Sequence, residues 1–167
     1  MNKSIMSLVI LGAISTPAIA EMNSHDHMSS EMGMEHNAMS MPSVSAVGMP
    51  ANGAQPDKVI PVVLSDDMTI QFKSSTPIKP GDIVQFVIMN KGKQSHEFSI
   101  GSPKEQADYR AMLSSMPNHH KTDGSSVVVK PGQAQRMLWH FHGTTTVEFD
   151  CNMSGHYGKG MTKTLVL

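Results

Sequence analysis

The stretch CNMSGHYGKGM at residues 151–161 contains the only cysteine of the chain and places two further side chains that can bind metals at equal steps beyond it. His156 follows Cys151 by five residues, and Met161 follows His156 by five. A lone thiol can be a buried apolar residue, an intermolecular crosslink, a catalytic nucleophile or a metal ligand. The fold and the function of the chain depend on which of these roles Cys151 has.

The residues around Cys151 favour the metal ligand. A buried apolar cysteine would not need an imidazole and a thioether in a glycine-rich loop, and a catalytic thiol would want an oxyanion site that nothing in the sequence supplies. Zinc rarely uses a thioether, whereas copper binds in sites built from one cysteine, two histidines and a long axial methionine. Cys151, His156 and Met161 supply three of these four ligands, so a second histidine is needed.

His96 is the best candidate for that second histidine. It opens the predicted strand HEFSI (96–100), and in a β-sandwich the start of this strand can lie beside the loop that carries Cys151. The neighbouring Glu97 either ties the two ligand segments together, through its carboxylate or its backbone, or is a solvated strand residue.

Four other histidines in the same part of the chain fit the site less well. His119 and His120 lie in the loop MPNHHKTD, and His140 and His142 lie in the stretch WHFH. Period-two alternation points the last two side chains to one face of a strand, where they form either a plain strand surface or a weak secondary metal site.

Residues 58–167 are predicted to form one all-β domain. Short runs rich in β-branched and aromatic residues alternate with glycine and proline turns, which is typical of a β-sandwich or barrel. The predicted strands cover 58–64, 68–73, 83–90, 96–100, 125–130, 134–141, 145–151 and 161–167.

One short helix interrupts the strands. Ser102, Pro103 and Glu105 fit an N-cap, a proline in the first turn and the acidic residue of a capping box. Tyr109, Met112, Leu113 and Met116 then recur on one helical face, which we interpret as a packing surface in preference to a metal site.

The first 20 residues have the pattern of a cleavable signal peptide. Lys3 precedes an apolar run from Ile5 to Ile14, and the segment ends in the small-x-small pattern of residues 18–20. The apolar run is too short to span a bilayer as a mature helix. Because a signal peptide directs export and is then removed, the mature chain is expected to lack a membrane span and to reside in the periplasm. Removing Lys3 changes the formal charge from −1 to −2, which gives no electrostatic basis for binding nucleic acid.

Residues 21–57 are predicted to be a disordered tail, because they contain no leucine, isoleucine or aromatic residue. They contain seven methionines and three histidines, a composition that suits Cu(I) unless the segment is only a spacer. The candidates for secondary copper binding are His25, His27, Met28, Met32, Met34 and His36.

The order His96 … Cys151-x4-His156-x4-Met161 on a small exported β-rich domain resembles the cupredoxin family of type 1 copper proteins. The finer resemblance is to periplasmic copper-tolerance cupredoxins of the CopI type, through the segment 90–101, the helix start at 102–112, the 151–161 loop and the Met/His-rich leader. The resemblance implies an eight-stranded Greek-key sandwich with one copper ion. It implies His96, Cys151 and His156 as equatorial ligands and Met161 as the axial ligand. Ser154 stands where close relatives often carry proline, which is expected to loosen the loop without changing the ligand spacing.

Three functions are compatible with such a site. The first is copper tolerance by binding, buffering or redox handling of copper, with the tail gathering ions, and the second is electron transfer to a periplasmic redox partner protein. The third, a cuprous oxidase, is disfavoured, because reducing oxygen by four electrons takes a cluster lined by several His-x-His pairs. The chain has two such pairs, His25-x-His27 and His140-x-His142. The methionine-rich tail favours tolerance, because an electron shuttle does not need it.

Overall fold

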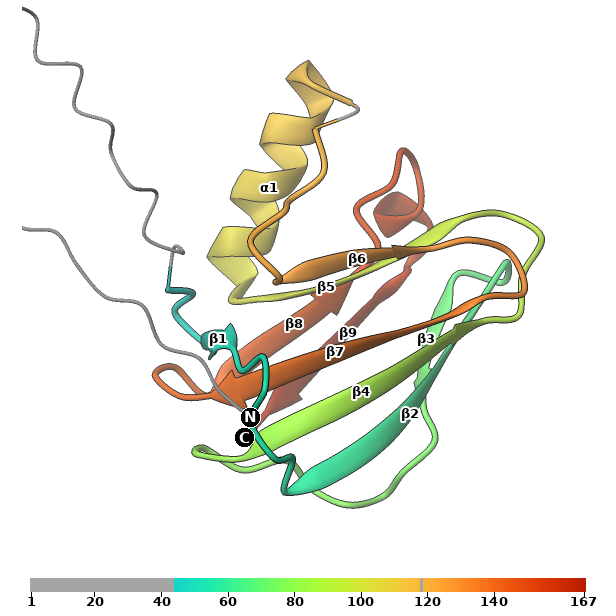
Figure 1. The fold of residues 1–167 in the computed structure, drawn as a ribbon. Coiled ribbons are helices and arrows are strands. Elements are labelled where there is room, and N and C mark those ends of the chain that lie inside the picture. Colours follow the sequence, from blue (N-terminus) through green and yellow to red (C-terminus); the bar gives the residue numbers. More distant parts are fainter. Residues whose placement is uncertain (1–43, 118) are drawn as a thin grey trace, which may run out of the picture. The chain divides into compact units, whose positions relative to one another are not determined.

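The computed structural model describes residues 44–117 and 119–167, which form a sandwich of two β-sheets (Figure 1). The larger sheet has the spatial order β1 (Gly48–Pro50), β7 (Ala134–Phe141), β4 (Ile83–Asn90), β2 (Lys58–Ser65), β3 (Thr69–Phe72). The smaller sheet has the order β6 (Ser126–Val129), β5 (His96–Gly101), β8 (Thr146–Asp150), β9 (Thr162–Val166). Neighbouring strands are antiparallel except for β2 and β4, which run parallel. The predicted all-β sandwich is confirmed.

All eight predicted strands are present, and the described residues contain a ninth, β1, in the segment that the sequence analysis assigned to the tail. Met49 of β1 lies opposite His140 of β7, and the preceding Val47 is fully buried. Gly48 allows this approach, because it has a φ of 142° and a Cβ there would lie 2.1 Å from the carbonyl oxygen of His140. Residues 44–57 therefore belong to the folded unit. The predicted signal peptide and the rest of the predicted tail lie outside the described residues.

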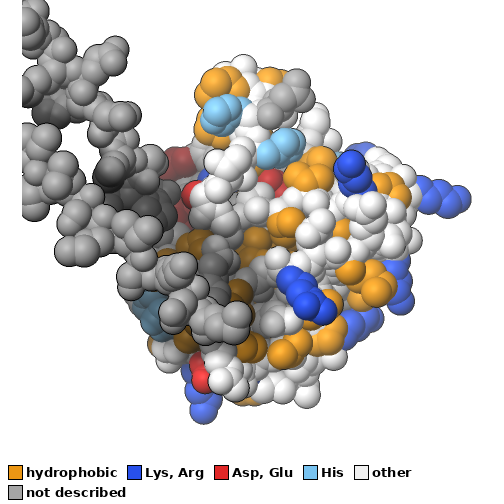
Figure 2. Space-filling view, viewed as in Figure 1, with side chains coloured by type: hydrophobic (Ala, Val, Ile, Leu, Met, Phe, Trp, Pro, Cys, Tyr) orange, Lys and Arg blue, Asp and Glu red, His pale blue; other side chains and the backbone are white. Residues whose placement is uncertain are grey.

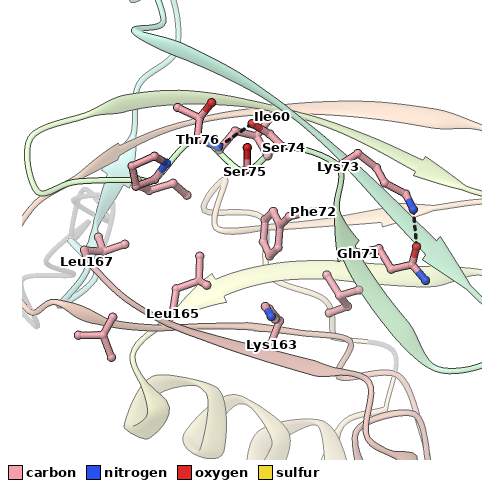
Figure 3. Close-up of a pocket in the computed structure, with 14 residues that line it drawn as sticks. Ile60, Gln71, Phe72, Lys73, Ser74, Ser75, Thr76, Lys163, Leu165 and Leu167 are labelled. Atoms are coloured by element: carbon pink, nitrogen blue, oxygen red, sulfur yellow. Dashed lines mark hydrogen bonds between the residues drawn. The ribbon is translucent and has the colours of Figure 1, made fainter.

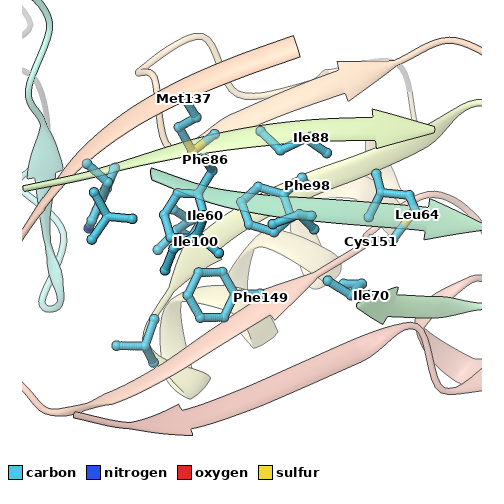
Figure 4. Close-up of a cluster of buried hydrophobic side chains, with 14 of the residues drawn as sticks. Ile60, Leu64, Ile70, Phe86, Ile88, Phe98, Ile100, Met137, Phe149 and Cys151 are labelled. Carbon is cyan, nitrogen blue, oxygen red and sulfur yellow. The ribbon is translucent and has the colours of Figure 1, made fainter. Parts of the chain in front are cut away.

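Aromatic side chains fill the space between the sheets (Figure 4). Phe86 of the larger sheet lies 5.4 Å from Phe98 and 5.7 Å from Phe149 of the smaller sheet, measured between ring centroids. All three are fully buried, as is Cys151 at the edge of the same cluster. The thiol is therefore held by the core of the domain and not by a loose surface loop.

The single predicted helix is α1 (Pro103–Ser115), and its N-terminus has the expected capping box. Ser102 accepts a hydrogen bond from the backbone of Glu105, and Glu105 accepts one from the backbone of Ser102. The Glu105 carboxylate also accepts hydrogen bonds from the Ser45 hydroxyl and the Ala46 N–H, both at 2.8 Å, so it fastens the entry to β1.

The predicted packing stripe of α1 is only partly correct. Tyr109 and Leu113 are buried as expected, but the third buried position is Gln106, and Met116 is 47% exposed just past the end of the helix. A buried glutamine was not predicted because its partners Ser99 and Asn152 lie in other elements and meet it only in the folded chain. Among the helices of the described residues, none is long and apolar enough to cross a bilayer.

Candidate metal centre

Strand register brings the two predicted ligand segments together. β5 and β8 are antiparallel, with Ser99 opposite Asp150, so the start of β5 meets the end of β8. His96 begins β5, and Cys151 directly follows β8. One donor atom from each of His96, Cys151 and His156 falls within 4.8 Å of the others, and all three residues are buried.

The Cys151 thiol lies at the centre of this cluster. Its Sγ is 3.2 Å from Nδ1 of His156 and accepts a hydrogen bond of 3.3 Å from the backbone N–H of Glu97. Burial raises the pKa of the Cys151 thiol to about 11, because a thiolate is poorly solvated in an apolar setting. A bound cation would reverse this preference, since metals hold cysteine as the thiolate.

His96 presents one ring nitrogen to the cluster, and its other ring nitrogen is hydrogen-bonded to Asp66. Its Nε2 lies 2.9 Å from Oδ1 of Asp66, so this nitrogen carries the proton and donates to the carboxylate. Its Nδ1 is buried without a hydrogen-bond partner among the described residues. The His96 ring lies 5.0 Å from the His156 ring between centroids, so the free Nδ1 belongs to the space that these rings and the thiol share.

Asp66 is itself fixed by the loop that precedes β5. It accepts backbone hydrogen bonds from Lys93 at 2.7 Å and from Gln94 at 3.3 Å. The backbone N–H of Lys93, followed by His96, lowers the pKa of Asp66. A Cβ on Gly92 would lie 2.0 Å from Oδ1 of Asp66, so glycine at that position makes room for the carboxylate.

Met161 closes the loop on the buried side. It is fully buried, its carbonyl accepts from the Cys151 N–H at 3.1 Å, and its own N–H donates to the His156 carbonyl at 3.2 Å. The short 3-10 helix η1 (Tyr157–Lys159) and the left-handed Gly160 make this return. Met153, the other methionine of the loop, is only partly buried and packs against the core.

The donor set fits a copper ion. Metal–nitrogen and metal–sulfur bonds of about 2.0 and 2.3 Å place ligand atoms about 3–4 Å from one another, and the 3.2 Å from Cys151 Sγ to His156 Nδ1 is in that range. The unpartnered Nδ1 of His96 needs a partner to offset its burial. One thiol, two imidazoles and a buried thioether are the ligand types of type 1 copper sites.

Glu97 joins the two ligand segments, which is one of the two roles that the sequence analysis considered for it. It is fully buried, so the solvated alternative is wrong. Its backbone N–H contacts the Cys151 sulfur, and its carboxylate accepts from the Asn152 N–H at 3.1 Å. The same carboxylate accepts from the Tyr109 hydroxyl at 2.8 Å and from the Ser126 hydroxyl.

Helix α1 braces the loop from outside. Gln106 and Asn152 share a hydrogen bond of 2.9 Å, and the Asn152 amide also donates to Ser99 at 3.0 Å. Arg110 pairs with Asp150, directly before the cysteine, and its guanidinium stacks on the Tyr157 ring at 3.5 Å. Sequence reasoning missed these supports and Asp66, because each depends on tertiary proximity and has no local pattern.

The remaining candidates lie away from this cluster. Histidine side chains reach the surface over the end of α1 (Figure 2), where His119 is exposed and His120 lies 3.6 Å from the Glu97 carboxylate. His140 and His142 pair with each other near the end of β7. The tail candidates His25, His27, Met28, Met32, Met34 and His36 lie outside the described residues.

A groove of about 620 Å³, lined by both polar and apolar side chains, lies between β3, the loop that follows it and β9 (Figure 3). Phe72, Leu165 and Leu167 point into it, and its lining includes no histidine, cysteine or carboxylate. It is therefore unrelated to the metal centre.

Comparison with known proteins gives relatives along the whole chain. It is 47% identical over 169 residues to the copper-resistant cuproprotein CopI of Vibrio cholerae serotype O1, a match that covers all of both chains. It is 31% identical over 152 residues to a protein of the same name from Pseudomonas aeruginosa, covering 73% of this chain and 82% of that one. A third protein of that name, from Rubrivivax gelatinosus, is 29% identical over 96% of this chain and 93% of its own. No protein-family model matches the chain.

Solved structures share the fold. Reduced auracyanin of Roseiflexus castenholzii superposes with a TM-score of 0.54 at 15% identity, over 68% of this chain and 98% of that one. An azurin of Methylomonas sp. strain J gives a TM-score of 0.51 at 15% identity, over 66% and 98%. At these identities the likeness concerns the sandwich alone.

Proposed function

The chain belongs to the CopI family of copper-resistant cuproproteins, and from this membership we propose that it binds one copper ion and contributes to copper tolerance by binding, buffering or redox handling of that metal. The observation that carries the proposal is the buried cluster of His96, Cys151 and His156, with Met161 closing the loop over it. When bound, copper supplies a one-electron redox couple and a cation beside the thiol.

Each residue of the cluster has a distinct task in this proposal. Cys151 gives up its proton and serves as the thiolate ligand, while the Glu97 N–H donates to its sulfur. His96 presents Nδ1 and keeps its proton on Nε2, where Asp66 accepts it. His156 presents Nδ1, the nitrogen that faces the sulfur. Met161 offers a weak thioether from the core side.

Hydrogen bonds and packing of the protein itself hold these donors in place. His96, Cys151 and Met161 adjoin strand ends in a packed sandwich, and the Glu97 and Asn152 hydrogen bonds join the two ligand segments. A ligand set that does not rearrange costs little reorganisation when an electron enters or leaves. This property serves both redox handling of copper and electron transfer.

The direct test is the colour of the copper-loaded protein. Purified protein with Cu(II) should show a strong visible thiolate-to-copper absorption, which Cys151→Ser abolishes. Ser154→Ala changes an exposed residue of the same loop and should keep the band. A colourless Cu(II) complex of the unmutated protein would overturn the type 1 site.

The histidine assignment has its own test. His96→Ala should open a position to water or added imidazole and turn the spectrum toward an ordinary tetragonal Cu(II) signal. His140→Ala is the matched control at the other end of the sandwich. The reverse outcome would place the second histidine ligand in β7.

Electron transfer to a periplasmic redox partner is the second candidate, because the rigid site serves it equally well. The Met/His-rich segment discriminates, since tolerance uses additional Cu(I) binding and a shuttle does not. Deleting residues 21–43, which stops before the folded unit, should leave the visible spectrum unchanged but lower both the Cu(I) stoichiometry and the copper tolerance of cells. Equal stoichiometry and equal protection would favour the shuttle.

We place the protein in the periplasm, exported by cleavage of residues 1–20. The pattern of Lys3, an apolar run and a small-residue end supports this. Mass spectrometry of the protein from a periplasmic extract should give a mature chain that begins at Glu21.

A further inference from the structure

Two histidines at the end of β7 form a pair that the site described above does not use. The rings of His140 and His142 are 5.2 Å apart between centroids and are inclined by 62°. Both residues are partly buried, and the Nε2 of His142 is buried without a hydrogen-bond partner among the described residues. A buried imidazole nitrogen without a partner is costly unless something binds it.

A methionine lies directly across the strand ladder from this pair. Met49 of β1 is the register partner of His140, so the two side chains project from the same face of the sheet. Met49 is 38% exposed, so its side chain is accessible from solvent. The thioether and the two imidazoles are thus neighbours on one surface.

The backbone around the pair is fixed. The His142 N–H donates to the Val47 carbonyl at 3.3 Å, and the Thr144 N–H donates to the Ala46 carbonyl at 2.8 Å. Gly48 permits β1 to approach β7 this closely, because a Cβ at this position would clash with the His140 carbonyl oxygen. Ligands on a defined strand pair need little further ordering to bind an ion.

We propose that His140, His142 and Met49 form a second metal site, which binds Cu(I). Two nitrogens that bind one ion at about 2.0 Å each lie at most about 4 Å apart, which rings 5.2 Å apart between centroids reach by side-chain rotation. Cu(I) accepts thioether sulfur, whereas zinc sites are four-coordinate and built from nitrogen, thiolate and carboxylate. The donor set therefore selects Cu(I) over zinc.

This site is separate from the first one. Ile83, at the start of β4, is the register partner of His140. Asn90, at the end of β4, donates to the carbonyl of Val129, which is the register partner of His96. The length of β4, about 23 Å at about 3.3 Å per residue, thus lies between the two sites. Figure 1 shows β1 and the end of β7 at one end of the sandwich, with the loop that follows β8 at the other.

The location suggests what the second site does. The Met/His-rich part of the sequence precedes residue 44, and the chain then enters the fold through β1, which carries Met49. An ion held here is too far from Cys151 to share its ligands. The site therefore adds capacity for Cu(I) beside the folded copper centre, and it stands whether or not that centre is of type 1.

The test uses the full chain under anaerobic conditions, with Cu(I) alone as the probe. The imidazole resonances of His140 and His142, followed by two-dimensional 1H–15N NMR, should shift together as Cu(I) is added. Their shift should be complete once one equivalent of Cu(I) has bound to this pair. His140→Asn/His142→Asn should bind one equivalent less Cu(I) than the unmutated protein in competition with a Cu(I) chelator. His119→Asn/His120→Asn, which removes two histidines from a loop of the same domain, should lose none.

Two further variants keep the outcome decisive. Met49→Leu should weaken binding at the pair while leaving the fold and the visible Cu(II) band unchanged. In Cys151→Ser, which removes the thiolate of the first site, the resonances of His140 and His142 should still respond to Cu(I). The two sites are therefore tested independently of each other. Resonances of His140 and His142 that do not move would overturn the second site, as would an equal loss of stoichiometry in the His119/His120 variant.

Discussion

Replacing Glu97 with glutamine tests whether its carboxylate organises the metal centre. Three donors point at it: the Tyr109 hydroxyl at 2.8 Å, the Ser126 hydroxyl, and the Asn152 N–H at 3.1 Å. Glutamine keeps the size of the side chain, but it removes the charge and turns one acceptor into a donor. The two hydroxyls can rotate to accept from that new donor, while the remaining amide oxygen still accepts from Asn152.

The magnitude follows from these three contacts. A hydrogen bond to a charged group contributes about 1.5–3 kcal/mol and a neutral one about 0.5–1.5 kcal/mol, so neutralising the acceptor costs about 1 kcal/mol at each contact. Relief from burying a charge offsets part of that sum. Glu97→Gln should therefore lower the free energy of unfolding by about 2 kcal/mol. Glu97→Leu should cost about 4 kcal/mol, because it leaves the donors unpaired at about 1–3 kcal/mol each.

Urea unfolding of the metal-free protein at pH 7 measures both values, and Glu148→Gln is the matched control. Glu148 lies in the neighbouring strand β8, its Oε2 is buried without a partner among the described residues, and burial raises the pKa of its carboxyl. Removing that charge should leave stability unchanged or increase it. If Glu97→Gln is as stable as the unmutated protein and keeps the same visible spectrum with Cu(II), the carboxylate does not hold the ligand segments together.

Three further predictions follow from single contacts. Asp66→Asn should raise the reduction potential of the copper-loaded protein in voltammetry, because a neutral partner on His96 Nε2 makes that imidazole a weaker donor to Cu(II); an unchanged potential would contradict this role. Met161→Leu should shift the potential more than Met153→Leu while copper occupancy stays high, and the opposite order would make Met153 the axial ligand. Burial alone would raise the pKa of Glu105, but donors from Ser102, Ala46 and Ser45 outweigh it and hold that pKa below 4.5. The stabilisation from Glu105 is thus present above pH 4.5 and is lost as the pH falls through the lower folded-state value, so acid unfolding of Glu105→Gln should lack that component.

The sequence predicted those parts of the fold that local patterns encode. β4 and β7 begin and end at the predicted residues, because their apolar runs are bounded by glycine and proline turns. The capping box of α1 was predicted because Ser102 and Glu105 form a local sequence pattern. β1 was missed because its three residues, Gly48–Pro50, have no strand pattern of their own. The edge of β7 and the glycine at position 48 make it a strand.

In the metal centre, too, the residues that follow a local pattern were predicted and the others were not. Cys151, His156 and Met161 lie in one short loop, so their spacing is visible in the sequence, and His96 could be inferred because it opens a strand. Asp66 could not, since it is 30 residues from the imidazole that it contacts. The buried Gln106 could not be predicted either, because its partners Ser99 and Asn152 meet it only in the folded chain.

The support of the loop by α1 explains how serine at position 154 is accommodated. A proline in the Cys-to-His segment would stiffen it by fixing one backbone angle. Here the segment is fixed by contacts on both sides of Ser154: Asn152 is held by Glu97, Ser99 and Gln106, and the His156 N–H donates to the Met153 carbonyl at 3.0 Å. Arg110 holds Tyr157 beyond it.

Because rigidity of this loop comes from tertiary contacts, weakening the helix should disturb the copper spectrum more than changing Ser154 does. Gln106→Leu, which removes the contacts to Ser99 and Asn152 but adds apolar surface, should broaden or shift the visible band, while Ser154→Pro should leave it in place. A band that responds to Ser154→Pro and ignores Gln106→Leu would show that the stiffness of the loop is local.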